Sequence, residues 1–157
     1  MTPTSPTLRA AVDADSPAVR ALVFAALQEH GLTPDPAGTD SDLAQLESNF
    51  GRRGGDFSVL VEVDGRVVGT CGLYPQADGA IELRKMYLKP ALRGRGQGRR
   101  LLHWALRRAR QLGFKRITLE TADVLQPAIA LYEAEGFELV SCGCATSRCN
   151  RRYQRDL

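Results

Sequence analysis

Arg93-Gly94-Arg95-Gly96-Gln97-Gly98 is the stretch that most narrows the choice of fold for this sequence. Its glycines lack side chains, so the backbone N–H groups can close on a ligand. A helical pattern follows, and a helix N-terminus adds partial positive charge. With Arg93, Arg95 and Arg99 as full charges, the stretch predicts a site for phosphate groups. The alternative interpretation is a mobile basic surface turn.

Two common nucleotide-binding motifs do not fit this stretch. A P-loop requires Gly-Lys followed by Ser or Thr, whereas Gly98 is followed by Arg99 and Arg100. A dinucleotide fingerprint requires Gly-x-Gly-x-x-Gly, and the last spacing differs here. The three strands expected before the stretch also do not alternate with helices, which argues against a doubly wound sheet.

The residues on either side predict one mixed α/β (α+β) domain over residues 7–157, after a disordered lead-in at 1–6. Hydrophobic periodicity and turn residues divide the chain into strands and helices. The expected strands are 8–12, 57–63, 66–74, 81–88, 116–121, 137–141 and 148–157, and the expected helices are 15–27, 43–50, 98–112 and 127–136.

In strand 57–63, apolar residues recur at every second position, Phe57, Val59, Val61 and Val63, which predicts one face turned inward. Asp64-Gly65 after it predicts a two-residue hairpin turn.

Strand 81–88 changes its apolar phase in the middle. Ile81 and Leu83 are apolar at odd positions, whereas Met86 and Leu88 are apolar at even ones. A one-residue bulge near Arg84-Lys85 would turn all four inward. Tyr87 does not fit this pattern, and a strand covered on both faces is the alternative.

The composition excludes several classes of protein. A net charge of +3 and a pI of about 8.8 are too weakly basic to indicate nucleic acid. No apolar run reaches membrane-spanning length and no signal-like stretch begins the chain, so a cytoplasmic protein without a membrane partner is expected. The spacing of Cys142, Cys144 and Cys149 matches no usual zinc pattern, so we expect structural thiols and no metal.

The order of these motifs resembles the GNAT superfamily of N-acetyltransferases. Arg93 to Gly98 fits the family's cofactor loop, and Glu82 to Pro90 is similar to its fourth strand. Ala128 to Phe137, which contains Leu131-Tyr132 and Gly136-Phe137, is similar to its second motif. The resemblance implies a mostly antiparallel central sheet flanked by helices.

The resemblance also implies that acetyl-CoA is the cosubstrate and that an amine attacks its thioester directly. Tyr132 matches the family tyrosine that protonates the departing thiolate, and Glu82 lies where a base would receive the ammonium proton. Cys149-Asn150 is a weaker candidate for the acceptor side. The family asparagine before the second motif is replaced by Leu125-Gln126-Pro127. The implied acetyl-CoA contacts are Met86, Tyr87, Leu88, Arg93, Gly94, Arg95, Gly96, Gln97, Gly98 and Arg99.

Two other functions remain open at this stage. One is a non-catalytic acyl-CoA-binding or sensing domain, and Tyr132 favours the enzyme over it. The other is a basic nucleic-acid-binding module, which the clustering of basic residues at one loop disfavours. The acceptor would be a small-molecule or peptide amine, and the chain a monomer or homodimer.

Overall fold

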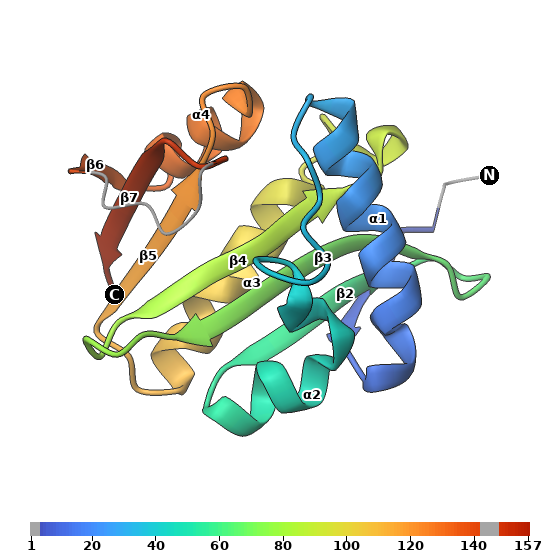
Figure 1. Ribbon diagram of the computed structural model, residues 1–157, viewed down its shortest axis with the longest axis horizontal. Coiled ribbons are helices and arrows are strands. Elements are labelled where there is room, and N and C mark those ends of the chain that lie inside the picture. The colour runs from blue at the N-terminus through green and yellow to red at the C-terminus, as the bar shows by residue number, and fades with distance from the viewer. Residues whose placement is uncertain (1–3, 142–147) are drawn as a thin grey trace.

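The protein folds around one seven-stranded sheet with the order β1-β2-β3-β4-β5-β7-β6. The computed structural model describes residues 4–141 and 148–157 (Figure 1). The expected fold class, a single α/β domain with a mostly antiparallel sheet, is confirmed. The strands are β1 (Thr7–Ala10), β2 (Asp56–Val61), β3 (Val67–Pro75), β4 (Ile81–Leu88), β5 (Arg116–Thr121), β6 (Glu138–Val140) and β7 (Arg151–Asp156), and the helices are α1 (Ser16–Glu29), α2 (Leu46–Asn49), α3 (Gln97–Gln111) and α4 (Gln126–Ala134).

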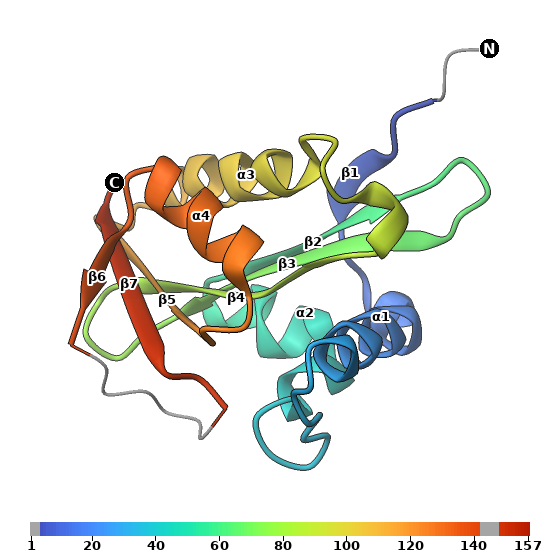
Figure 2. The same cartoon turned by 90° about the horizontal axis from the view of Figure 1, so that it is seen from above.

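Helices cover both faces of the sheet. Figure 2 shows α3 and α4 on one face and α1 and α2 on the other. The core under α3 and α4 includes Leu101, Ile117 and Tyr153, and the core under α1 and α2 includes Val19, Leu43 and Phe50. Burial of each such side chain contributes about 1.5–3 kcal/mol, so the two cores hold the helices against the sheet.

One strand pair differs from all the others. β4 and β5 are parallel, whereas every other neighbouring pair is antiparallel. Their pairing covers only Ile81–Leu83 of β4 and Ile117–Leu119 of β5. Beyond these residues the two strands no longer pair, and the sheet opens there.

The expected bulge in β4 is confirmed. Thr70 pairs with Tyr87 and Gly72 pairs with Arg84. Two residues of β4, Lys85 and Met86, therefore lie opposite the single residue Cys71 of β3. Lys85 has a φ of 55°, which is the left-handed region and is rare for a residue with a side chain. As expected, Met86 and Leu88 pack with Ile81 and Leu83, while Tyr87 packs on the opposite face of the sheet.

The expectation for strand 57–63 was wrong in two respects. β2 ends at Val61, and Val63 is 83% exposed. Leu60 packs under α3 while Val59 and Val61 pack under α1, so both faces of β2 are buried. The reason is tertiary, since β2 lies inside the sheet between β1 and β3 with helices over each face.

The turn after β2 also differs from the expected two-residue turn. Glu62 N–H donates to Arg66 O at 2.9 Å and encloses three residues, and Gly65 has a φ of 88°. A three-residue loop of this kind commonly ends in a left-handed glycine.

Other element boundaries also differ from expectation. The helix expected over 43–50 is a 3-10 helix at Ser41–Ala44 followed by the four-residue α2. The last strand begins at Arg151 and not at Arg148, and β6 ends at Val140. Pro6, in the stretch expected to be disordered, is buried and its carbonyl accepts a hydrogen bond from Arg100 Nη1 at 2.6 Å. Cys71 is buried in the core, whereas Cys142 and Cys144 lie outside the described residues.

Candidate active site

A cleft of about 1270 Å³ occupies the opening between β4 and β5. Its walls come from nearly the whole of β4, the end of β5, the loop before α3, and α4. The connection between α1 and α2, which crosses the middle of β4 (Figure 1), closes the other side. The sheet therefore positions one continuous cavity between segments that are far apart in the sequence.

The loop before α3 forms one end of the cleft. Gly94, Gly96 and Gly98 all line it, and the first two have φ values of 74° and 79°, which only glycine adopts readily. Gly96 is the N-cap of α3 and supplies no side-chain cap. The first N–H groups of a helix have no partner within the helix, so those of α3 suit an anion.

The arginines of this loop have different surroundings. Arg93 lies 2.7 Å from Glu29, and Arg99 lies 3.0 Å from Glu135, yet both line the cleft. Arg95 is exposed and makes no ion pair with any described residue, but it is not part of the cleft wall. Gln97 also lies outside the wall and accepts a hydrogen bond from Arg100.

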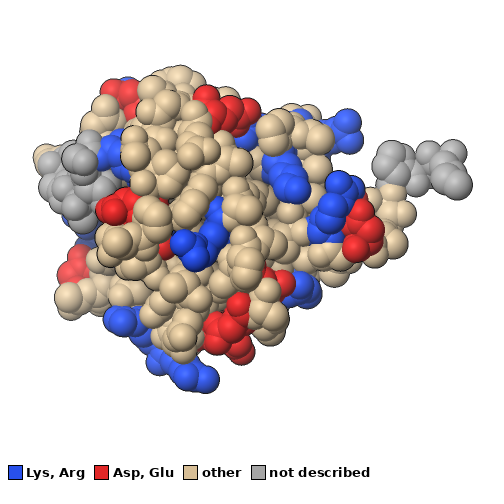
Figure 3. Space-filling view, turned by 45° about the vertical axis from the view of Figure 1, so that its right-hand side comes forward, with Lys and Arg blue, Asp and Glu red and all other residues tan. Residues whose placement is uncertain are grey.

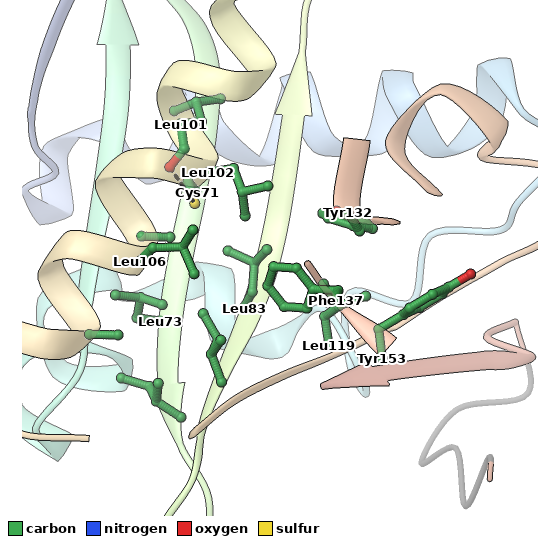
Figure 4. Packing of buried hydrophobic residues seen from close by; sticks show 14 of the residues in the cluster. Cys71, Leu73, Leu83, Leu101, Leu102, Leu106, Leu119, Tyr132, Phe137 and Tyr153 are labelled. Carbon is green, nitrogen blue, oxygen red and sulfur yellow. Dashed lines mark hydrogen bonds between the residues drawn. The ribbon is translucent and has the colours of Figure 1, made fainter. Parts of the chain in front are cut away.

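Tyr132 lies on the α4 side of the cleft and is 6% exposed. Its ring packs 5.7 Å from that of Phe137 and 6.5 Å from that of Tyr153, as Figure 4 illustrates. Burial raises the pKa of Tyr132 well above its usual value. The hydroxyl therefore carries its proton at neutral pH and can act only as a donor toward an anion.

Glu82, the candidate base, lines the cleft near the start of β4. Its Oε1 accepts a hydrogen bond from Arg84 Nε, and its side chain is 17% exposed. The Arg84 guanidinium carbon lies 3.8 Å from the centroid of the Tyr74 ring, a cation–π contact. The structure thus brings Glu82 together with a cation and an aromatic ring, which strand position alone did not indicate.

A buried charged cluster beside Glu82 was not anticipated from the sequence. Asp40 forms ion pairs with Lys85 and with Arg148, and the side chain of Asp40 is 0% exposed. Burial opposes ionisation of Asp40, but hydrogen bonds from Arg148 and Lys85 outweigh it and hold the pKa of that carboxyl below its usual range. No local pattern could reveal this cluster, because its members are 45 and 108 residues apart.

The weaker acceptor-side candidates are separated by the structure. Cys149 lines the cleft, whereas Asn150 donates to Asp123 Oδ2 at 3.0 Å outside it. Leu125 and Pro127, at the position of the replaced family asparagine, also line the cleft.

Three further properties concern metal binding, membrane spans and surface charge. No set of three or more His, Cys, Asp or Glu residues within 4–141 and 148–157 is arranged to hold a metal ion. Of the helices in those same residues, none is both long and apolar enough to cross a bilayer. On the face drawn in Figure 3, Lys and Arg are interspersed with Asp and Glu and do not form one continuous basic surface.

Comparison with known proteins identifies the family of the chain. The model of the acetyltransferase (GNAT) family matches residues 23–137. The Escherichia coli protein with the name "Uncharacterized N-acetyltransferase YjgM" is 39% identical over 163 residues, which cover 99% of this chain and 97% of that protein.

Solved structures of the same class share the fold. A GNAT-family acetyltransferase from Staphylococcus aureus has a TM-score of 0.90 at 22% identity and covers 96% of this chain and 98% of its own. A GNAT superfamily phosphinothricin acetyltransferase from Sinorhizobium meliloti, in complex with acetyl-CoA, has a TM-score of 0.77 at 25% identity and covers 98% of this chain and 89% of its own.

Fold and cleft together are those of an acyl-CoA-dependent acetyltransferase with acetyl-CoA as its cosubstrate. The chain belongs to the acetyltransferase (GNAT) family.

Proposed function

We propose that this enzyme transfers the acetyl group of acetyl-CoA to a primary amine by direct attack within a ternary complex. The observation that carries the proposal is the continuous cleft between β4 and β5. It runs from the loop of Gly94, Gly96 and Gly98, called the glycine loop below, to two carboxylates, Glu82 and Asp42. An anionic cosubstrate suits the first end, and a cationic amine suits the second. Both substrates can therefore meet beside the bulge.

On the cosubstrate side, the pyrophosphate would lie on Gly94, Gly96, Gly98 and the N-terminus of α3. Arg93 and Arg99 line this end of the cleft. Arg95, which is exposed, lies between the lining residues Gly94 and Gly96. The pantetheine arm would run along the backbone of Met86, Tyr87 and Leu88, where β4 no longer pairs with β5.

The bulge offers a means of stabilising the reaction's intermediate. Where Lys85 and Met86 both face Cys71, the regular ladder of β4 is interrupted. An N–H group released in this way would donate to the thioester oxygen as that oxygen becomes negative. Thr70 Oγ1 donates to the Lys85 carbonyl at 2.7 Å and so helps to hold the bulge.

In the proposed proton transfers, Glu82 acts as base and Tyr132 as acid. The ammonium loses one proton to Glu82, and the neutral nitrogen then attacks the carbonyl carbon. A C–N bond forms, the C–S bond breaks, and sulfur leaves with the bonding pair. Tyr132 protonates the thiolate, and the second nitrogen proton returns to the tyrosine oxygen, directly or through water. One proton is released to solvent overall.

The experiment that tests this function is a screen for acceptors. Purified protein is incubated with acetyl-CoA and with amino acids, polyamines, aminoglycosides or peptides, and CoA release and the acetylated product are both measured. The Sinorhizobium protein is named for a small-molecule acceptor, which supports beginning with small amines. If no amine raises CoA release above the rate of hydrolysis and no acetylated product forms, the proposed function is wrong.

A further inference from the structure

The acceptor end of the cleft contains two carboxylates, Asp42 and Glu82, on either side of one guanidinium. Arg84 Nε donates to Glu82, and Arg84 Nη1 lies 3.5 Å from Asp42 Oδ2. The same guanidinium rests 3.8 Å from the centroid of the Tyr74 ring. Two anions and an aromatic face together are what proteins use to bind a cation.

Asp42 is the unusual member of this group. Its side chain is 10% exposed, and neither carboxylate oxygen accepts a hydrogen bond from any residue the structure describes. A buried carboxylate whose only partners are ion pairs at 3.5 and 3.7 Å is costly, because such contacts replace the lost water incompletely. Such a group in the wall of a substrate cleft therefore indicates a partner that is not part of the described chain.

The neighbouring cations satisfy Asp42 only in part. Lys85 Nζ is 3.7 Å away and is held by Asp40, while Arg84 is directed toward Glu82. Burial raises the pKa of Asp42, Asp40 adds to the rise, and Lys85 and Arg84 oppose it without cancelling it. A cation within hydrogen-bonding distance of Asp42 would therefore supply the partner that this buried carboxylate lacks.

We propose that Asp42, Glu82 and the face of Tyr74 form the binding site for the ammonium group of the acceptor, and that the Arg84 guanidinium fills this site in the free enzyme. The acceptor ammonium displaces Arg84 and donates to both carboxylates. An ammonium is compact and carries three donors, whereas the planar guanidinium is committed to Glu82 through Nε. The Arg84 side chain is 30% exposed, so it can turn toward solvent.

This inference rests on the proposed amine acetylation and specifies its acceptor class, an alkylamine that is protonated in solution. Because the internal cation competes with the acceptor, removing the two partners should have opposite effects. Loss of Arg84 should strengthen acceptor binding, whereas loss of Asp42 should weaken it. A purely structural role for this cluster would make both substitutions harmful.

The first test measures cation binding without catalysis. Propylammonium chloride is titrated into the CoA-saturated protein and followed by NMR chemical shifts. Arg84→Ala should bind this probe at least threefold more tightly than wild type, and the double variant Arg84→Ala/Asp42→Asn should lose the gain. If Arg84→Ala is unfolded, Arg84→Met keeps the apolar stem and carries the same expectation. Equal or weaker binding by a folded Arg84 variant overturns the inference.

The second test uses the amine that the acceptor screen identifies. We expect its KM to fall at least threefold in Arg84→Ala and to rise at least tenfold in Asp42→Asn, with the KM for acetyl-CoA unchanged. Asp78 and Arg116 are the matched controls, because they also form an aspartate–arginine pair, at 3.1 Å, but lie outside the cleft wall. Arg116→Ala and Asp78→Asn should leave the acceptor KM unchanged.

The two tests distinguish failure of the cation site from failure of the proposed amine acetylation. Acetylation with a raised acceptor KM in Arg84→Ala overturns the cation site and leaves the proposed function intact. Tighter propylammonium binding by Arg84→Ala, lost in the double variant and combined with no acetylation of any amine, supports the cation site and overturns the proposed function.

Discussion

The ammonium of Lys85 is ion-paired with the carboxylate of Asp40, 45 residues earlier in the chain. Both side chains are almost inaccessible to water, at 6% and 0% exposed. Lys85 is also the residue of the bulge with a φ of 55°, a conformation that costs an L-residue roughly 1–2 kcal/mol. The ion pair therefore fixes the side chain of the strained residue at the point where we expect the thioester to bind.

Asp40→Asn should destabilise the fold strongly. The substitution leaves two buried cations, Lys85 and Arg148, without their carboxylate. Breaking a buried ion pair in this way costs about 3–5 kcal/mol. Urea unfolding at neutral pH measures the loss. Asp64→Asn, at an exposed carboxylate in the β2–β3 loop, should change the free energy of unfolding by less than about 0.5 kcal/mol. A similarly small effect of Asp40→Asn would contradict this account of the cluster.

The same carboxylate predicts a dependence of stability on pH. Because folding lowers the pKa of Asp40, its contribution is fully present above the unfolded pKa, near the ordinary 3.8. That contribution is lost as the pH falls below this value toward the folded pKa. The free energy of unfolding should therefore decrease more between pH 5 and pH 3 in wild type than in Asp40→Asn, where this group no longer titrates. Parallel curves for the two proteins would argue against a depressed pKa.

Arg95→Glu should weaken acetyl-CoA binding about tenfold or more, since it replaces an attractive charge at the glycine loop with a repulsive one. Isothermal calorimetry measures the affinity, and higher salt should reduce the difference. The matched control is Arg107→Glu, the same change at an exposed site further along α3. If wild type binds CoA and phosphate-free pantetheine equally well, the phosphate site itself is wrongly assigned.

Tyr132→Phe should lower kcat on the order of a hundredfold while the KM for acetyl-CoA stays the same, because the hydroxyl acts only as the thiolate departs. Tyr153→Phe is a close control. Its ring is 6.5 Å from that of Tyr132, but its hydroxyl donates to Glu133 at 3.1 Å and does not line the cleft. It should change stability and leave kcat nearly unaltered. Wild-type turnover by Tyr132→Phe would make Tyr132 a packing residue only.

Glu82→Gln should lower the rate of acetylation mainly at neutral pH. Most alkylamine molecules are then protonated and need a base before they can attack. At alkaline pH the amine loses its proton to solvent, so the variant should approach the wild-type rate. A pH–rate profile of both proteins checks this, with Glu138→Gln on the exposed β6 as control. A profile with the wild-type shape would reduce Glu82 to a binding group.

Much of the fold follows from local patterns. The glycine loop and the helix after it obey the rules of helix N-termini, so both were predictable from residues 93–112 alone. The bulge in β4 was also predictable from the change of apolar phase between Leu83 and Met86, although a strand covered on both faces was the alternative, and the pairing with β3 decides for the bulge. In contrast, the alternation in β2 was misread, since burial of its second face depends on α3, a helix more than thirty residues away.

The candidate active site also contains residues that the sequence indicated and residues that it did not. Sequence motifs were sufficient to nominate Glu82, Tyr132 and the cofactor loop, because each lies within a short characteristic pattern. They could not reveal Asp40, Asp42 or Arg148, which occur in stretches without a recognisable motif. Their ion pairs form only because the α1–α2 connection, the segment before β7 and β4 lie together in the folded chain. Charge pairing across such distances depends on chain folding and leaves no local periodicity.

The sequence by itself determined the fold class, most of the order of elements, the glycine loop before α3 and the family resemblance, because these depend on backbone preferences and apolar periodicity within one segment. The tertiary structure alone decided which carboxylates reach the acceptor end and which cations accompany them. It placed Asp42 in the cleft wall without a hydrogen bond from the described residues and set Arg84 between Asp42 and Glu82. The physical reason is that burial and ion pairing depend on distance in space, which the order of residues does not express.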